Sequence, residues 1–358
     1  MTGIIGYGVY IPRLRLRVED IWNMWVNPTD TDAIIKKRRG LAEKAVTRWD
    51  EDSVTMAIYA AKSSLEIAGI DPKELNAVYL GSCTNPYCSG AAGPVIAEAL
   101  GTVPELMCAD CQFSTKSGTA AIQICAALAT SGIIRYGLAI GSDALSRHVP
   151  PNDVLEYSAS SGAAAFLVGK DKVIAEIEGM HSYTTLTPEF FRLSGERYIK
   201  HAAGEDDEYL VGYSRHIKKA VEGYLKKFSG KAEDFMYVAL SQPDGQMPID
   251  VSKEIGFSEE QIKLGLMAAD IGDCGSASPL LSLAAILDQA KPGQRILLIS
   301  YGFGAGCDVL GLKTTNQIEE ATKRRATYPS VREMISNKEY IDYAQSLRQE
   351  RKLIQEYV

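Results

Sequence analysis

Short apolar runs alternate along the chain with amphipathic stretches of helical spacing, which is the pattern of an α/β protein. Residues 53–68 (SVTMAIYAAKSSLEIA) repeat apolar positions at helical spacing and are followed by Gly69 and Pro72, so we predict a helix that stops there. The rest of the first part predicts four strands and one buried, almost uncharged helix (119–130), with the strands at 77–80, 106–109, 136–140 and 163–168.

The second part of the chain repeats this order of elements. We predict, in turn, a charged helix (216–228), a strand (237–240), a Gly/Ser-rich turn (271–279), an apolar helix (280–289) and a strand (295–300). The last strand opens into YGFGAGCDVLGL, which resembles the earlier YGLAIGSDA. We interpret this as two repeated α/β halves, 1–170 and 216–315. Between them, 171–215 is a polar and aromatic connecting segment that we expect to cap an active-site mouth, and 316–358 is a charged helical tail.

Composition and charge narrow the class of protein. The net charge of −7 argues against the basic surface that nucleic-acid binding requires, and no apolar run reaches the length of a membrane span. The N-terminus, MTGIIGYGVYIPRLRL, lacks the basic-then-apolar order of a signal peptide and predicts a first strand and turn. We therefore expect a cytoplasmic protein with no nucleic-acid or membrane partner, whose 7 cysteines are reduced thiols.

Two cysteine pairs raise the question of a metal site. Cys108 and Cys111 have CxxC spacing, whereas Cys83 and Cys88 are further apart, and no histidine follows at ligand spacing. Small buried side chains explain these cysteines better than zinc ligands do, so we expect no metal.

Several segments spread over the chain carry a resemblance to a known family. They include GIIGYGVYIPRLRL, AVYLGS, ADCQFSTKSGTAAIQ, YGLAIGSD, LEYSASSGAAAFLVGK, SQPDGQMP and LLSLAAILDQAKPGQRILLISYGFGAG. In content and order they resemble the archaeal-type hydroxymethylglutaryl-CoA synthases of the thiolase superfamily. The resemblance implies a thiolase fold, with two pseudo-repeated halves in a five-layered αβαβα core, and a homodimer. It also implies a coenzyme A thioester as substrate, no covalently bound cofactor, and a possible small zinc-ribbon/OB-fold companion protein.

The positions that carry catalysis in that family differ in this chain. In the family, a cysteine at a helix start takes the acyl group from CoA, a histidine and an asparagine hold the second substrate's carbonyl, and a glutamate relays the proton. Flanking residues place these four at Thr115, Ser241, Asp273 and Cys83, respectively. The chain is thus identified as a divergent member without the usual catalytic residues.

Thr115 is a poor replacement for a nucleophilic cysteine, because a hydroxyl needs an adjacent base to take its proton. The chain has four histidines, His148, His181, His201 and His216, and none lies in a segment that the family uses for catalysis. We expect the two in loops, His148 and His201, to be exposed bystanders. Acyl-enzyme chemistry through Thr115 is therefore not expected.

Asp273 and Cys83 each allow more than one interpretation. An ionised Asp273 could be a general base toward a hydroxyl or an acidic carbon, a protonated one could donate to an oxyanion, and either could cap a helix. Cys83 could accept an acyl group, or it could fill the space of a lost glutamate. No basic residue lies next to Cys83 in sequence to lower the pKa of its thiol, which favours the second interpretation.

Tyr301 and the glycines after it form a turn that borders the reaction centre in this superfamily. The phenol could donate to a carbonyl, or the ring could simply pack. Gly302, Gly304 and Gly306 are candidate CoA-binding positions, since glycine lets the backbone approach a substrate closely.

Three functions fit this sequence. The first is an enzyme that makes or breaks a C–C bond of a CoA thioester by aldol or Claisen chemistry without an acyl-enzyme, in a pocket lined by Cys83, Thr115, Ser241, Asp273 and Tyr301. The second is a non-catalytic subunit that pairs with a paralogue. The third is an acyltransferase that uses Cys83 as a relocated nucleophile. We favour the first, because the replaced positions remain rich in hydrogen-bonding groups.

Overall fold

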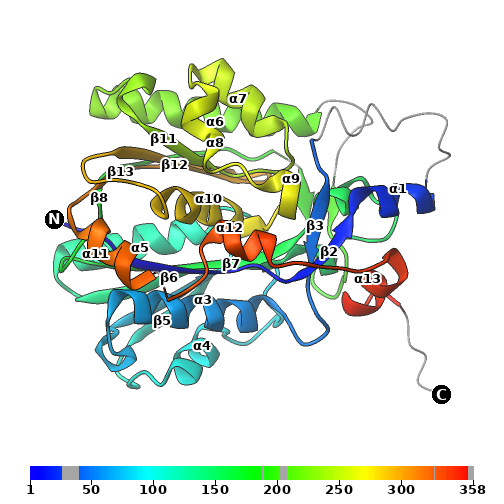
Figure 1. Cartoon of the computed structure of the whole chain (residues 1–358), viewed down its shortest axis with the longest axis horizontal. Helices are drawn as coiled ribbons and strands as arrows, with labels where there is room; N and C mark the ends of the chain where they lie inside the picture. The colour runs from blue at the N-terminus through cyan, green and yellow to red at the C-terminus, as the bar shows by residue number, and fades with distance from the viewer. Residues whose placement is uncertain (26–39, 188, 202–207, 326, 354–358) are drawn as a thin grey trace.

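A computed structural model describes residues 1–25, 40–187, 189–201, 208–325 and 327–353 of the chain. Its elements form five layers that alternate helices and sheets (Figure 1). The two outer layers consist of helices, with Glu208–Phe228 (α6), Met247–Ile255 (α7) and Glu259–Lys263 (α8) on one side and Ser53–Ala68 (α3) and Gly93–Leu100 (α4) on the other. The five-layered arrangement expected from the sequence is confirmed.

The strands between the helical layers form one continuous nine-stranded sheet, whose two halves we call the N-terminal sheet and the C-terminal sheet. The N-terminal sheet has the order β5-β4-β6-β7-β1, from the strands Gly3–Tyr10 (β1), Ala77–Gly81 (β4), Met107–Cys111 (β5), Tyr136–Ala144 (β6) and Ser161–Gly169 (β7). The C-terminal sheet has the order β11-β12-β13-β8, from Ala175–Thr184 (β8), Tyr237–Leu240 (β11), Arg295–Gly302 (β12) and Gly306–Thr314 (β13). Most of these strands are buried and apolar, as expected for sheets covered on both faces.

The two sheets repeat each other's topology. In the first, β4 and β6 are parallel and β7 runs antiparallel to both β6 and β1. In the second, β11 and β12 are parallel and β13 runs antiparallel to both β12 and β8. The sheets meet where Gly3 and Ile4 of β1 pair with Glu176 and Ala175 of β8. The predicted internal repeat is confirmed, and β5 is an additional strand at the edge of the first sheet.

Two buried helices, Ser117–Ser131 (α5) and Ser278–Leu287 (α10), form the central layer between the sheets (Figure 1). Their N-terminal ends approach closely, because the hydroxyls of Ser117 and Ser276 lie 2.9 Å apart. A side chain at Gly118 would not fit, since its Cβ would lie 2.8 Å from the carbonyl oxygen of Ser276. Small residues at both helix starts therefore bring the loops of the two halves into contact.

Helix α3 shows how local sequence sets these elements. Asp52 caps its start by accepting from the backbone N–H groups of Val54 (3.0 Å) and Thr55 (2.8 Å). Gly69 ends it in the left-handed conformation, with φ of 68°. The helix predicted over 53–68 is confirmed at both ends.

The connecting segment predicted over 171–215 differs in the structure. Its first part forms β8, which pairs along its length with β13 and belongs to the sheet, so the prediction of a cap there is wrong. The polar residues of β8 misled the prediction, because most of them are half-buried or exposed rather than in a cap. Two short strands, Phe190–Phe191 (β9) and Lys200–His201 (β10), pair further on, and α6 begins at Glu208.

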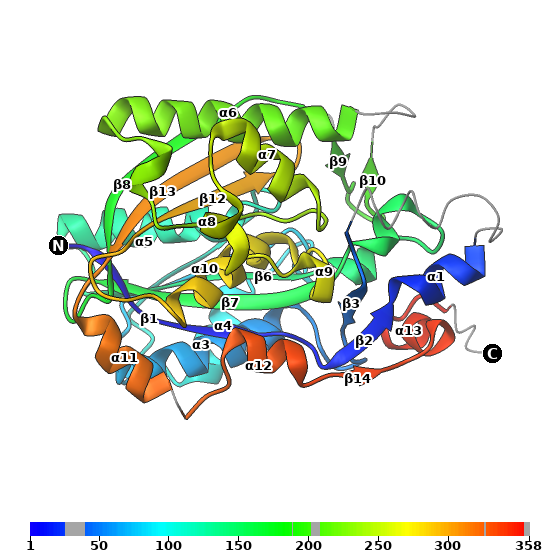
Figure 2. The same cartoon turned by 45° about the horizontal axis from the view of Figure 1, so that its top comes forward.

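A third, small sheet connects the chain ends. It has the order β14-β2-β3, from Leu14–Arg17 (β2), Glu43–Val46 (β3) and Glu339–Tyr340 (β14). Val18–Trp25 (α1) and Tyr343–Gln349 (α13) pack beside this sheet. Gln317–Arg325 (α11) packs against α3 instead, and Val331–Ser336 (α12) packs against α10. Figure 2 shows β9 and β10 at the same end of the molecule as α1 and α13. Within the described ranges, no helix has the length and apolar character needed to span a bilayer.

Candidate active site

The five residues proposed from the sequence lie around the starts of the two central helices. Cys83 follows β4 and Ser241 follows β11, while Tyr301 lies near the end of β12. Thr115 precedes α5 and Asp273 precedes α10. Carboxyl ends of parallel strands share one edge of a sheet, which is why residues far apart in sequence gather here.

Thr115 is buried and its hydroxyl is fully engaged by the turn after β12. Its Oγ1 donates to the carbonyl of Tyr301 (2.8 Å) and accepts from the N–H of Phe303 (3.3 Å). No carboxylate or imidazole of the described residues accepts the proton of this hydroxyl. Thr115 therefore anchors the turn and has no base to activate it as a nucleophile.

Ser241 and Tyr301 are also hydrogen-bonded to each other. The hydroxyl of Ser241 accepts from the backbone N–H of Tyr301 (2.9 Å), and the N–H of Ser241 donates to Ile299 (3.1 Å). The ring of Tyr301 is fully buried and meets the rings of Tyr213 and Phe303 edge-on, at 5.3 Å and 5.2 Å between centroids. These contacts fix the turn that carries Phe303.

Glu189 is a site residue that the sequence analysis missed. Its carboxylate accepts a hydrogen bond from the Tyr301 phenol and another from the N–H of Gly304 (3.3 Å). Burial raises the pKa of Glu189, while the Tyr301 hydrogen bond opposes that rise. The acidic residue in an otherwise aromatic TPEFF stretch was the available signal.

His216 was set aside from the sequence but lies against the Tyr301 ring, 5.7 Å between centroids. It is fully buried, with Nδ1 donating to the carbonyl of Gly212 (2.8 Å) and Nε2 facing the hydroxyl of Thr185 (2.7 Å). Both ring nitrogens are therefore engaged. The expectation that His148 is exposed is wrong, because its side chain is half-buried, and this burial lowers the pKa of His148 to about 4. The side chain of His201 lies outside the described residues.

Cys83 lies beside a buried carboxylate that joins the two halves. The Oδ1 of Asp143 accepts from the N–H of Cys83 (2.9 Å) and from the hydroxyls of Ser82 (2.9 Å) and Thr84 (2.7 Å). Its Oδ2 accepts from the N–H of Ser276 (2.7 Å) and from that residue's hydroxyl. Burial and the Asp143 charge raise the pKa of the Cys83 thiol well above its ordinary value. The thiol is consequently neutral at pH 7, which disfavours a nucleophilic role.

Asp273 borders a small pocket. It is nearly fully buried, and its carboxylate accepts from the N–H of Gly275 (2.9 Å). Burial raises its pKa from 3.8 to about 7, with a further contribution from the charge of Asp143. Its backbone is fixed by the carbonyl of Ser158 (2.7 Å) and the N–H of Ser160 (2.8 Å). A carboxyl group that titrates near neutral pH is suited to general acid–base chemistry.

Asp273 and Ser158 are the two polar residues of a small pocket of about 10 Å³, roughly room for one water molecule, which we call the inner pocket. It is lined by Leu145, Val149, Leu155, Ser158, Ala159, Ile199, Asp273 and Phe303. Cys83 packs against the same apolar cluster. The inner pocket therefore combines one titratable carboxyl group, one hydroxyl and an apolar wall.

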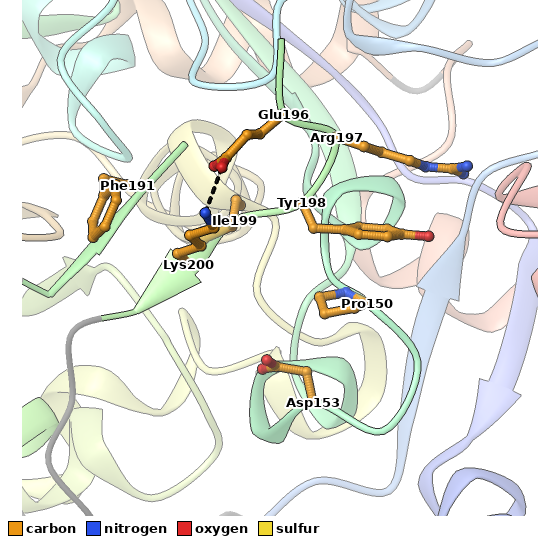
Figure 3. Close-up of a pocket in the computed structure, with 8 residues that line it drawn as sticks. All are labelled: Pro150, Asp153, Phe191, Glu196, Arg197, Tyr198, Ile199 and Lys200. Carbon is orange, nitrogen blue, oxygen red and sulfur yellow. Dashed lines mark hydrogen bonds and ion pairs between the residues drawn. The ribbon is translucent and has the colours of Figure 1, made fainter. Parts of the chain in front are cut away.

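A larger cavity of about 650 Å³, the outer cavity, opens next to the inner pocket (Figure 3). It is lined by Pro150, Asp153, Phe191, Glu196, Arg197, Tyr198, Ile199 and Lys200. In Figure 3, Pro150 and Asp153 lie on one side and the residues of the connecting segment on the other. That this part of the connecting segment covers an active-site mouth stays a prediction.

The three glycines after Tyr301 are crowded by the protein's own atoms. A Cβ at Gly302 would lie 2.8 Å from the side chain of Lys116, and one at Gly304 would lie 2.6 Å from the carbonyl of Thr187. Gly304 also has φ of 77°, which favours glycine. At Gly306 a Cβ would lie 2.4 Å from the carbonyl of Tyr183. Packing alone thus requires glycine, and CoA binding at these positions stays a prediction.

All seven cysteines are free thiols. Cys274, for example, donates to the carbonyl of Ser161 (3.4 Å) and forms no bridge to Cys83. Among the described residues, no three His, Cys, Asp or Glu side chains form a group able to hold a metal ion.

Comparison with known proteins agrees with this architecture. Residues 225–313 match the family described as 3-oxoacyl-[acyl-carrier-protein (ACP)] synthase III C terminal. The structure of MvaS in complex with 3-hydroxy-3-methylglutaryl coenzyme A superposes with a TM-score of 0.85 at 20% identity, covering 100% of this chain and 94% of that one. The 3-oxoacyl-[acyl-carrier-protein] synthase III of Aquifex aeolicus superposes with a TM-score of 0.78 at 22% identity, covering 87% of this chain and 100% of that one. The thiolase fold is confirmed.

Two full-length relatives are closer in sequence. The hydroxymethylglutaryl-CoA synthase of Methanocaldococcus jannaschii is 43% identical over 344 residues, which cover 96% of this chain and 97% of the relative. That of Archaeoglobus fulgidus is 41% identical over 353 residues, which cover 99% of both chains. At this identity and coverage, the chain belongs to the hydroxymethylglutaryl-CoA synthase family.

Proposed function

We propose that this protein makes or breaks a C–C bond of a CoA thioester by aldol chemistry, with Asp273 as the general base and no acyl-enzyme. The single observation that carries the proposal is Asp273, whose pKa is raised to about 7 by burial beside the apolar inner pocket. Of the relatives named above, the closer ones in sequence are hydroxymethylglutaryl-CoA synthases, and MvaS binds 3-hydroxy-3-methylglutaryl coenzyme A. This chain shares their fold over its full length. The engaged hydroxyl of Thr115 explains why a different mechanism is required.

In the cleavage direction, Asp273 would take the proton from the 3-hydroxyl of a 3-hydroxyacyl-CoA. The bond between C2 and C3 then breaks, C3 becomes a carbonyl carbon, and the electron pair passes to C2 to give the thioester enolate. The proton held by Asp273 returns to C2, so the products are an acyl-CoA and an aldehyde or ketone, with no net oxidation and no water consumed. Ser158, which lines the same pocket, would donate its hydroxyl proton in a hydrogen bond to the developing oxyanion.

Turnover tests this proposal directly. Purified protein would be incubated with a panel of 3-hydroxyacyl-CoAs, and the released carbonyl compound and acyl-CoA would be measured by chromatography and mass spectrometry. Equimolar formation of both products supports the proposal. Turnover only when a second protein is added would favour the alternative of a non-catalytic subunit in a heteromer.

We expect no covalent acyl adduct on this protein. After incubation with acetyl-CoA and acid quenching, intact-mass measurement should give the unmodified mass, because the Thr115 hydroxyl has no base and the Cys83 thiol is neutral. An added acetyl group that maps to Cys83, and that disappears in Cys83→Ser, would replace this mechanism by an acyltransferase with a relocated nucleophile.

We also propose that two copies pair through β5, as in the homodimer that the family resemblance implies. β5 is an edge strand, and Met107 on it is 44% exposed. A lysine at position 107 should weaken the dimer at least ~10-fold, measured by light scattering over a dilution series, since edge lysines oppose strand pairing. Met236→Lys, exposed elsewhere, is the control. An unchanged dimer in Met107→Lys would exclude this edge as the interface.

The remaining partner and compartment expectations stay proposals. The free thiols fit a reducing compartment, and we propose the cytoplasm. A small zinc-ribbon/OB-fold companion and a heteromer with a paralogue both rest on the family resemblance alone.

A further inference from the structure

Four charged residues from distant parts of the chain form a buried cluster beside the segment that leads to Asp273. They are Lys44 of β3, Glu156 of the short 3₁₀-helix Val154–Tyr157, and Glu350 and Lys352, which follow α13. Each of the four is at most 6% exposed. Two lysines and two glutamates balance in charge, as charges that are removed from water must.

Glu156 joins the C-terminal segment to the rest of this cluster. Its Oε1 lies 3.7 Å from the ammonium nitrogen of Lys352 and accepts from the phenol of Tyr343 in α13 (3.0 Å). Its Oε2 accepts from the N–H of Asn152 (2.8 Å), and its backbone carbonyl accepts from the ammonium group of Lys44 (2.7 Å). Groups near both ends of the chain therefore fix the position of Glu156.

The backbone after Glu156 carries this position to Asp273. The carbonyl of Ser158 accepts from the N–H of Asp273 (2.7 Å), and the N–H of Ser160 donates to the carbonyl of Asp273 (2.8 Å). The hydroxyl of Ser160 also accepts from the N–H of Ala45 in β3 (3.1 Å) and donates to its carbonyl (2.9 Å). The segment from Glu156 to Ser160 thus connects the buried cluster with the residue that borders the inner pocket.

We propose that Glu156 and Lys352 are positioning residues for Asp273, which hold its carboxyl group in its buried place through the segment from Glu156 to Ser160. The inference rests on the proposed function, in which Asp273 is the general base. Neither Glu156 nor Lys352 lines the inner pocket, so both act through Asp273 and not on a substrate. The C-terminal segment, distant in sequence, becomes a requirement for the site.

The direction of a pKa change separates positioning from a direct effect of charge. Burial is the main cause of the raised pKa of Asp273, and the charges of Asp143 and Asp244 add to it. If Lys352→Met loosens the segment, water reaches Asp273 and its pKa falls toward the ordinary value of 3.8. If Lys352 acted on Asp273 by its positive charge alone, the same substitution would raise that pKa.

The test measures this pKa without turnover. Urea unfolding of the full-length protein from about pH 3 to about pH 9 gives the stability difference between a protein and its Asp273→Asn counterpart. The pH at which this difference stops changing reports the folded-state pKa of Asp273. We expect about 7 in the wild-type background. In the Lys352→Met background we expect a value lower by at least ~1 pH unit. An unchanged or higher value would overturn the proposal.

A second variant and a control complete the experiment. Lys352→Met leaves Glu350 without its ion-pair partner at 2.8 Å. A double variant that adds Glu350→Gln removes the unpaired charge and keeps the cluster neutral, so it replaces the single variant if that does not fold, and it should show the same fall. Lys323→Met is the control, because the pair of Lys323 with Glu320 (2.7 Å) is exposed on α11, which packs against α3. An equal fall in this control would also overturn the proposal.

Turnover of a 3-hydroxyacyl-CoA is a separate measurement. Lys352→Met should lower kcat about 10²-fold, the cost of a slightly misplaced catalytic group, and leave KM unchanged. A lowered pKa of Asp273 in a protein that cleaves no 3-hydroxyacyl-CoA would sink the proposed reaction and leave the positioning role standing. Wild-type kcat in Lys352→Met, with the pKa of Asp273 unchanged, would do the reverse.

Discussion

Replacing Asp273 with asparagine is expected to reduce kcat/KM for cleavage of a 3-hydroxyacyl-CoA by roughly 10²–10⁴-fold, the usual contribution of a general base. Asparagine has nearly the same shape, and its carbonyl oxygen can still accept from the N–H of Gly275, which now bonds the carboxylate at 2.9 Å. The substitution therefore removes the base and keeps the turn. Product formation by chromatography measures the effect.

The pH dependence should identify Asp273 as the base. Its pKa is raised to about 7, and the base acts only when ionised. In the cleavage direction, kcat/KM of the wild-type protein should therefore rise with pH through about 7 and then level off, whereas the residual activity of Asp273→Asn should not follow this curve.

The same substitution should stabilise the protein at alkaline pH. Because burial raises the folded-state pKa of Asp273 from 3.8 to about 7, the folded protein holds a proton that the unfolded chain releases. This proton contributes to the free energy of unfolding of the wild type, and that contribution is lost as pH rises from about 4 to about 7. Asp273→Asn has no such contribution to lose. At pH 8 we expect the variant to be more stable by on the order of 1–4 kcal/mol, with no gain near pH 3.5.

This combination separates loss of the base from loss of the fold. Urea unfolding at pH 8 and pH 3.5 gives the stability difference, and the turnover assay gives the activity. An Asp273→Asn variant with wild-type turnover would exclude the proposed mechanism. Loss of both activity and stability at pH 8 would instead assign Asp273 a structural role.

The elements that depend on local sequence could be predicted, and α3 is an example. Its cap at Asp52, its apolar spacing and its stop at Gly69 all lie within the helix or next to it. The repeat of the two halves also followed, but the likeness of YGLAIGSDA to YGFGAGCDVLGL does not mark equivalent strands, because the first forms β6 and the second spans the end of β12, a turn and most of β13. β8 was misassigned because its polar residues hide the alternation of a half-buried strand.

The positions of the proposed site residues could be predicted, but the hydrogen bonds that their side chains form could not. The family resemblance placed Thr115 and Tyr301 at the same centre, yet whether the Thr115 hydroxyl faces a substrate depends on a carbonyl 186 residues away. Glu189 was missed because the connecting segment brings it to Tyr301 only in the folded chain. The raised pKa of Asp273 likewise comes from burial, which a lone aspartate in IGDCG does not reveal.

The largest effect on stability is expected at Asp143, which joins the loops of the two halves. Its two oxygens accept from groups on Ser82, Cys83, Thr84 and Ser276, and the residue is fully buried. Asp143→Asn replaces one acceptor oxygen with an NH₂ group that faces donors, and it removes the charge that strengthens the remaining bonds. We expect the free energy of unfolding to fall by about 3–5 kcal/mol, measured by urea denaturation.

A matched control lies near the end of β5. Asp110 accepts from the N–H groups of Ala92 (2.7 Å) and Gly93 (2.8 Å) and from the Asn85 amide (3.1 Å), but it is only half-buried. Water can replace a lost acceptor there, so Asp110→Asn should cost only about 1 kcal/mol. Equal losses in the two variants would mean that Asp143 gains nothing from its burial between the halves. A larger loss at Asp143 would mean that the same carboxylate positions the Cys83 loop and the turn next to Asp273, so that the site forms only when both halves are packed together.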